Sequence, residues 1–153
     1  MHKSVCLLIV LGMMFSSPVL WGFKVQVGSF FEIDKITYKK GRLVLPVTRR
    51  KYHNVRVLDK ETFVWLSSCG EQTICKQALA EASFQIEQIR PAQTRPDMWI
   101  ADVSFGDKWL ITFLLFKNGN DFSLQVPKVF KFLDVQLQTQ VFKELVARVE
   151  KEK

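Results

Sequence analysis

The sequence predicts an α+β fold, in which an antiparallel meander sheet carries one short internal helix and a C-terminal helix packed on it. Short apolar runs separated by Gly, Asn and Asp turns predict the strands. Helix-forming residues between 72 and 82 predict the internal helix. An apolar residue at every fourth position from Leu137 to Val149 predicts the C-terminal helix. A sheet curved strongly enough to become barrel-like is an open alternative.

The most informative stretch is the predicted hairpin Trp99–Phe116, whose two apolar runs meet at a Gly-Asp turn. Its second strand is apolar on both faces except for Thr112, which predicts a central strand covered on both sides. A two-residue loop would pair Phe105 with Lys108, whereas a three-residue loop would pair Phe105 with Trp109. We favour the second register, because it places every large residue of the alternating first strand on one face.

The other strands are predicted from short runs bounded by turn residues. The predicted ranges are Lys24–Phe31, Ile33–Tyr38, Leu43–Val47, Asn54–Leu58, Thr62–Leu66, Phe84–Arg90 and Phe122–Val126. From Phe84 to Val126 the chain therefore predicts a four-strand antiparallel meander. Pro127–Leu133 is predicted to be a connector. Asp134 is predicted to cap a helix that begins at Val135 and covers the second face of the central strand.

The N-terminus has the layout of a secretory signal peptide. Lys3 supplies a basic start, Ser4–Phe15 is apolar, and Pro18 ends the run. We therefore expect residues 1–22 to be a signal peptide and 23–153 to form a single domain that is periplasmic or secreted. The alternative is an uncleaved membrane anchor, since the 20 residues from 4 to 23 carry no charge.

Two cysteines follow this segment, Cys69 and Cys75. A pair in an exported chain predicts a disulfide, here one that closes a short loop at the start of the internal helix. The spacing does not match the two-residue gap of redox-active pairs, and no second Cys or His pair completes a zinc site. We expect neither a metal nor a cofactor.

The chain is basic, with a net charge of +7. Its cations cluster in two predicted turn regions, which would form a patch for an anionic partner if they converged. The candidate residues are Lys39, Lys40, Arg42, Arg49, Arg50, Lys51 and Arg56. Another envelope protein, an anionic lipid or a glycan would suit such a patch. We expect no nucleic acid, because an exported protein seldom meets it and the aromatic residues occupy core positions of strands.

Catalytic motifs are missing from the sequence. It contains no G-x-S-x-G elbow, no H-E-x-x-H pair and no phosphate-binding glycine loop, and His53 is the only histidine after the signal. We therefore expect a small exported, non-catalytic binding or envelope-assembly protein. A carrier is the alternative, because a curved sheet containing many of the 13 phenylalanines would suit a small apolar ligand or lipid. An enzyme of unrecognised type is the third class.

Overall fold

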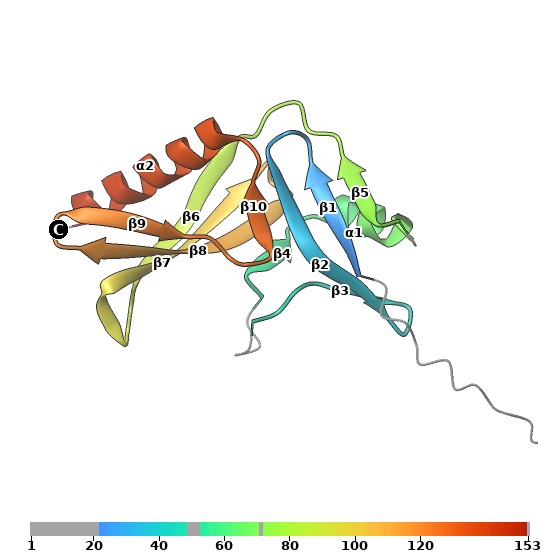
Figure 1. Cartoon of the computed structure of the whole chain (residues 1–153), viewed down its shortest axis with the longest axis horizontal. Helices are drawn as coiled ribbons and strands as arrows, with labels where there is room; N and C mark the ends of the chain where they lie inside the picture. The colour runs from blue at the N-terminus through green and yellow to red at the C-terminus, as the bar shows by residue number, and fades with distance from the viewer. Residues whose placement is uncertain (1–21, 49–52, 71, 153) are drawn as a thin grey trace, which may run out of the picture.

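The computed structural model describes residues 22–48, 53–70 and 72–152. Within these residues, ten strands form two mostly antiparallel five-stranded sheets, and two helices pack on them (Figure 1). The sheets do not close into a barrel, so the α+β prediction is confirmed without the barrel alternative. The predicted signal peptide lies outside the described residues apart from Gly22, and so do Arg49, Arg50 and Lys51.

Sheet A contains β10, β2, β1 and β5 in that order, with β3 also paired to β2. Its strands are β1 (Gly22–Val27), β2 (Phe31–Lys39), β3 (Arg42–Val44), β5 (Ile74–Gln77) and β10 (Phe130–Phe132). Sheet B contains β4, β8, β7 and β6, with β9 also paired to β8. Its strands are β4 (Val55–Val57), β6 (Phe84–Ala92), β7 (Arg95–Phe105), β8 (Trp109–Asn118) and β9 (Asp121–Gln125). The helices are α1 (Lys60–Ser68) and α2 (Val135–Lys151).

The predicted hairpin register is confirmed in β7 and β8. Phe105 lies opposite Trp109, and the same register continues to Met98 opposite Phe116. Gly106 and Asp107 adopt the positive φ angles that the turn requires, at 57° and 54°. Lys108 therefore needs no glycine-like conformation, and its N–H donates to the Phe105 carbonyl at 3.1 Å. Strands β6 to β9 form the predicted antiparallel meander.

Helix α2 begins at Val135 under an Asp134 cap, as predicted, but the strands it packs against most are β6 and β10. Its buried stripe, including Val141, belongs to the same hydrophobic cluster as Ile111 and Phe113. Leu114 and other side chains of the opposite β8 face are absent from that cluster. On this second face only Leu110 is buried, whereas Thr112, Leu114 and Phe116 are half-buried. The prediction that the helix covers this face was therefore wrong.

The internal helix was predicted in the wrong place. Residues Thr62–Leu66, predicted as a strand, belong to α1. The Asp59 side chain accepts a hydrogen bond from the Thr62 N–H at 3.0 Å and caps the helix. Thr62 and Leu66 are buried at a four-residue spacing, so helical packing outweighs the β propensity of this stretch.

Residues Gln72–Ala82 contain the strand β5 instead of the predicted helix. This strand runs parallel to β1, with Val25 opposite Cys75. Cys69 follows α1 and lies at disulfide distance from Cys75, with their Cα atoms 5.8 Å apart. The pairing with β1 and this cross-link hold the segment extended, despite its helix-forming composition.

Two smaller predictions also fail locally. The strand predicted over Lys24–Phe31 breaks at Gly28, which has a φ of +51°. A Cβ there would lie 2.9 Å from the Phe30 ring, so the turn into β2 requires glycine. The predicted connector Pro127–Leu133 contains β10, which pairs with β2.

The interior between the sheets is filled by phenylalanine rings. Phe105 and Phe113 from sheet B meet Phe31, Phe130 and Phe132 from sheet A, with ring centroids 4.9–6.4 Å apart. Four of these five rings are buried, and Phe132 packs against them. Aromatic packing therefore joins the two sheets into one hydrophobic cluster.

Candidate functional site

The outward side of sheet A gathers positive charge from all five of its strands. Along β1, Phe23 and Val25 are buried whereas the intervening Lys24 is not, and the other strands alternate in the same way apart from the β2 bulge at Asp34 and Lys35. The outward-facing cations, which we call the basic face, are Lys24, Lys39, Arg42, Lys76 and Lys131. Strand pairing alone brings these residues together, since they span more than 100 positions of the chain.

The cations of the basic face are spread across the neighbouring strands of sheet A. Lys76, Gln26, Glu32 and Lys131 are successive cross-strand neighbours in one row over β5, β1, β2 and β10. Strands are about 4.8 Å apart, so this row is roughly 14 Å wide. At physiological salt the Debye length is about 8 Å, so charges at the two ends of the row are largely screened from each other. A partner must therefore lie directly against the face to interact with all of its charges.

Few carboxylates offset this charge. Glu32 is the outward-facing acid of the row, and its Oε1 atom lies 3.1 Å from the Lys24 ammonium group. Asp34 lies in the β2 bulge, where it accepts the Lys35 N–H at 2.8 Å. The other four cations of the basic face have no ion pair among the described residues. The face therefore retains a positive excess.

The β2–β3 turn concentrates cations at one end of the basic face. Lys39 and Arg42 are direct cross-strand partners, and Lys40 lies between them in the turn with a φ of 51°. Like charges directly opposite each other destabilise an antiparallel pair. The arrangement therefore opposes strand pairing, and a bound anion would relieve the repulsion.

The structure separates the residues of the predicted patch. Lys39, Lys40 and Arg42 stay together at the β2–β3 turn. Arg56 instead lies in β4 of sheet B, where its guanidinium group is 3.3 Å from the Asp102 carboxylate. Asp102 also accepts the Thr112 hydroxyl at 2.5 Å, as its cross-strand position predicts, so Arg56 has a structural partner.

Sequence reasoning missed three members of the basic face, Lys24, Lys76 and Lys131. Each stands between two more buried residues in a short alternating stretch. That alternation was a usable signal for Lys24, which was predicted to lie in a strand. It was not usable for Lys76 or Lys131, because their segments were predicted as a helix and a connector.

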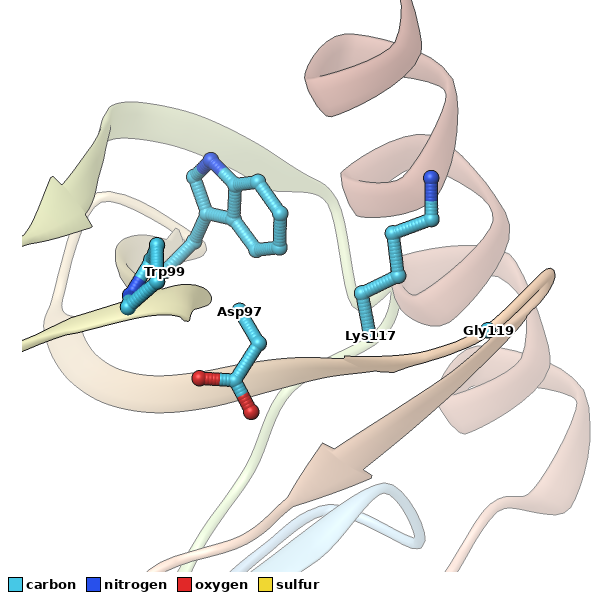
Figure 2. A pocket seen from close by; sticks show the side chains of 5 residues that line it. Asp97, Trp99, Lys117 and Gly119 are labelled. Atoms are coloured by element: carbon cyan, nitrogen blue, oxygen red, sulfur yellow. The ribbon is translucent and has the colours of Figure 1, made fainter.

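A separate shallow hollow of about 400 Å³ lies at the far end of sheet B, beside α2 (Figure 2). Its lining includes Asp97, Trp99 and Lys117. Arg95 donates two hydrogen bonds to Asp97, at 3.0 and 3.4 Å, and thereby lowers the pKa of this carboxyl group. The Trp99 ring packs 6.1 Å from the Phe122 ring. The Asp97 carboxylate in this hollow is thus already hydrogen-bonded to a neighbouring side chain of the fold.

A second hollow lies between α1, β5 and the β7–β8 turn. The buried Trp109 donates its indole N–H to Gln77 at 2.8 Å, and Gln77 donates to the Thr62 hydroxyl at 3.4 Å. Burial tends to raise the pKa of nearby Asp59, but hydrogen bonds from Thr62 and the Lys108 ammonium group outweigh it, so the pKa is lowered. These polar contacts join α1 to both sheets.

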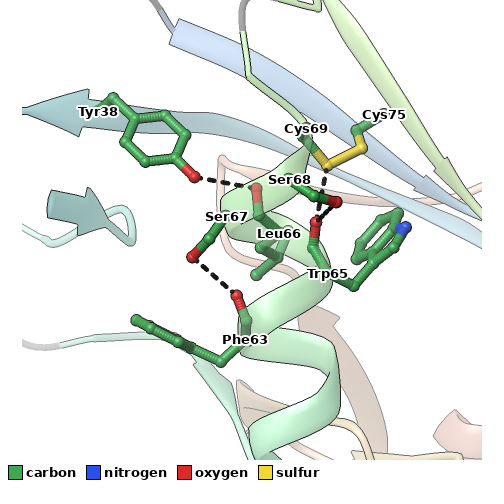
Figure 3. Close-up of a disulfide and its surroundings, with 8 residues drawn as sticks. All are labelled: Tyr38, Phe63, Trp65, Leu66, Ser67, Ser68, Cys69 and Cys75. Carbon is green, nitrogen blue, oxygen red and sulfur yellow. Dashed lines mark hydrogen bonds between the residues drawn. A yellow bond between two sulfur atoms is a disulfide. The ribbon is translucent and has the colours of Figure 1, made fainter. Parts of the chain in front are cut away.

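The cysteine pair fastens the end of α1 to β5 (Figure 3). Both Cys69 and Cys75 are buried. The Tyr38 hydroxyl donates to the Leu66 carbonyl at 3.2 Å and ties the same end of the helix to β2. Cys69 and Cys75 therefore lie where a disulfide would hold the end of α1 against sheet A.

Comparison of the chain with models of known protein families, with curated proteins and with solved structures finds no match. Among the described residues, no cluster of three His, Cys, Asp or Glu side chains is arranged to hold a metal ion. Neither α1 nor α2 is long and apolar enough to cross a membrane, and these are the helices of the described part.

Proposed function

We propose that this protein is an exported, non-catalytic binding protein that attaches to a polyanionic partner of the envelope through the basic face. The observation that carries the proposal is five outward cations set against the single outward carboxylate Glu32 within the regular strand pairs of sheet A. Complementary charge steers association and orients the partners. A positive surface spread over several strands suits an extended anionic partner.

Export is supported by two independent features. The N-terminal sequence has signal-peptide layout, and the buried Cys69 and Cys75 lie at disulfide distance. A non-catalytic role is supported by the hydrogen bonds that engage Asp97 in one hollow and Gln77 in the other with neighbours of their own fold.

The carrier alternative receives less support. A carrier needs internal space, whereas Phe31, Phe105 and Phe113 pack against one another between the sheets. Both described hollows open on the surface and lie away from this aromatic cluster. The phenylalanines therefore favour a filled core over a ligand cavity.

The test compares two variants that each remove three positive charges. The face variant is Lys39→Gln, Lys76→Gln and Lys131→Gln. The control variant is Lys60→Gln, Lys143→Gln and Lys151→Gln, whose positions lie on the two helices. Binding of the full chain to soluble inorganic polyphosphate is measured by calorimetry in a neutral detergent.

We expect the face variant to bind about tenfold more weakly than the wild type, because each exposed charge contact contributes roughly 0.5 kcal/mol. The control variant should bind within about twofold of the wild type. Equal losses in the two variants would show that net charge alone governs binding, and would refute a role for the basic face.

A further inference from the structure

We infer that the partner of the basic face is an anionic lipid membrane, on which sheet A lies flat with two aliphatic side chains reaching between the headgroups. This inference rests on the proposed function and names its partner. The two aliphatic side chains are Ile74 in β5 and Val44 in β3. Lipid headgroups supply the negative charge, and the interface below them accepts apolar groups.

Ile74 and Val44 point to the same side as the cations. Ile74 lies beside Lys24 in the parallel pair of β1 and β5, and Val44 lies opposite Thr37 in the pair of β2 and β3. Their exposed fractions are 47% and 36%, although both are branched aliphatic residues. The basic face thus combines point charges with protruding apolar groups, as in surfaces that bind membranes peripherally.

Other anionic partners fit the face less well. The outward positions of the paired strands of sheet A carry no aromatic ring, whereas single-stranded nucleic acids are bound by stacking on aromatic side chains. The two hollows described above are lined by other residues, so neither of them places a small anion on the basic face. Four of the five cations are lysines. A lysine ammonium group acts as a point charge, whereas an arginine guanidinium group binds one phosphate or carboxylate through two hydrogen bonds.

The chain itself leads into this sheet. The apolar run Ser4–Phe15 lies a few residues before β1, an interior strand of sheet A. If that run is retained as an anchor, β1 is the first described strand after it, and sheet A is the sheet closest to the bilayer along the described chain. If the run is cleaved, the basic face provides the attachment without it.

The test is residue-specific acetylation of lysines in the full chain, read by mass spectrometry. The chain is mixed with vesicles of phosphatidylglycerol, with vesicles of phosphatidylcholine, or with soluble polyphosphate. The lysines expected to be protected are Lys39, Lys76 and Lys131, and the internal controls are Lys60, Lys143 and Lys151. Protection of individual lysines reports which face of the protein lies on the vesicle. The result can therefore be interpreted even if the N-terminal segment binds both vesicle types.

On phosphatidylglycerol we expect acetylation of the face lysines to slow at least fivefold relative to phosphatidylcholine, while the controls change less than twofold. Protection by polyphosphate but not by phosphatidylglycerol would overturn the lipid inference and leave the proposed function standing. Absence of protection in both would overturn both. Equal protection by the two lipids would also overturn the lipid inference, because it would show no need for anionic headgroups.

A second variant isolates the apolar contribution. Ile74→Thr with Val44→Thr keeps β-branching and charge but replaces a methyl or ethyl group with a hydroxyl. We expect the face lysines to need about tenfold more phosphatidylglycerol for the same protection, whereas protection by polyphosphate stays unchanged. An unchanged lipid requirement would refute the insertion of these two side chains.

Discussion

Replacing Phe113 tests which face of β8 is the core and whether the interior is filled. The Phe113 side chain is fully buried, and its ring lies 5.6 Å from the Phe130 ring and 5.7 Å from the Phe132 ring. Phe113→Ala would therefore remove burial and aromatic contacts together, and we expect a loss of about 3–5 kcal/mol in the free energy of unfolding.

The matched control lies three residues further along the same strand. Phe116 is on the opposite face, outside the hydrophobic cluster and only half-buried, with the Arg95 guanidinium group 5.2 Å from its ring. Phe116→Ala should cost about 1 kcal/mol, since its side chain is only partly buried and lies outside the hydrophobic cluster. The two losses are measured by urea unfolding followed by circular dichroism. Equal losses, or a larger loss at Phe116, would refute the assignment of the core face.

Three further predictions concern contacts within the fold. Asp59→Ala should cost about 1 kcal/mol at pH 7, because the variant loses the α1 cap. The pKa of Asp59 is lowered in the folded protein, so the stability advantage of the wild type over the variant should be lost as pH falls through that pKa. Urea unfolding of both proteins between pH 7 and pH 2 checks this. Cys69→Ala with Cys75→Ala should lower stability by roughly 2 kcal/mol by the loop-entropy argument, and an unchanged urea midpoint would contradict a structural disulfide. Asp102→Ala should cost about 1–3 kcal/mol, because the partly buried hydrogen bond from Thr112 and the two arginine contacts lose their acceptor. Thermal unfolding checks this, and a stabilised variant would refute it.

Local burial patterns explain what could be predicted from the sequence. The Phe105–Trp109 register follows from alternation within one hairpin, where a one-residue slip would reverse every side chain. Helix α2 was predicted because its apolar stripe and Asp134 cap are both local signals. The face of the sheet that it covers depends on sheet A, whose position no local pattern specifies.

The errors lie where distant segments decide the local structure. Thr62–Leu66 has strand propensity but becomes helical because Asp59 caps it and Thr62 and Leu66 become buried. The β5 segment has helix-forming neighbours but pairs with β1, about 50 residues earlier. The basic face depends on that pairing, so a cluster in the sequence indicated only its Lys39–Arg42 end.

The salt dependence of polyphosphate binding tests the basic face most directly. Each lysine that contacts a phosphate releases about one counterion, so it contributes about one unit to the slope of log affinity against log salt. We expect Lys39→Gln, Lys76→Gln and Lys131→Gln together to reduce the slope by about three units. The control variant at Lys60, Lys143 and Lys151 should keep the wild-type slope. Equal slopes for the face variant and the wild type would contradict direct contact between these lysines and the anion.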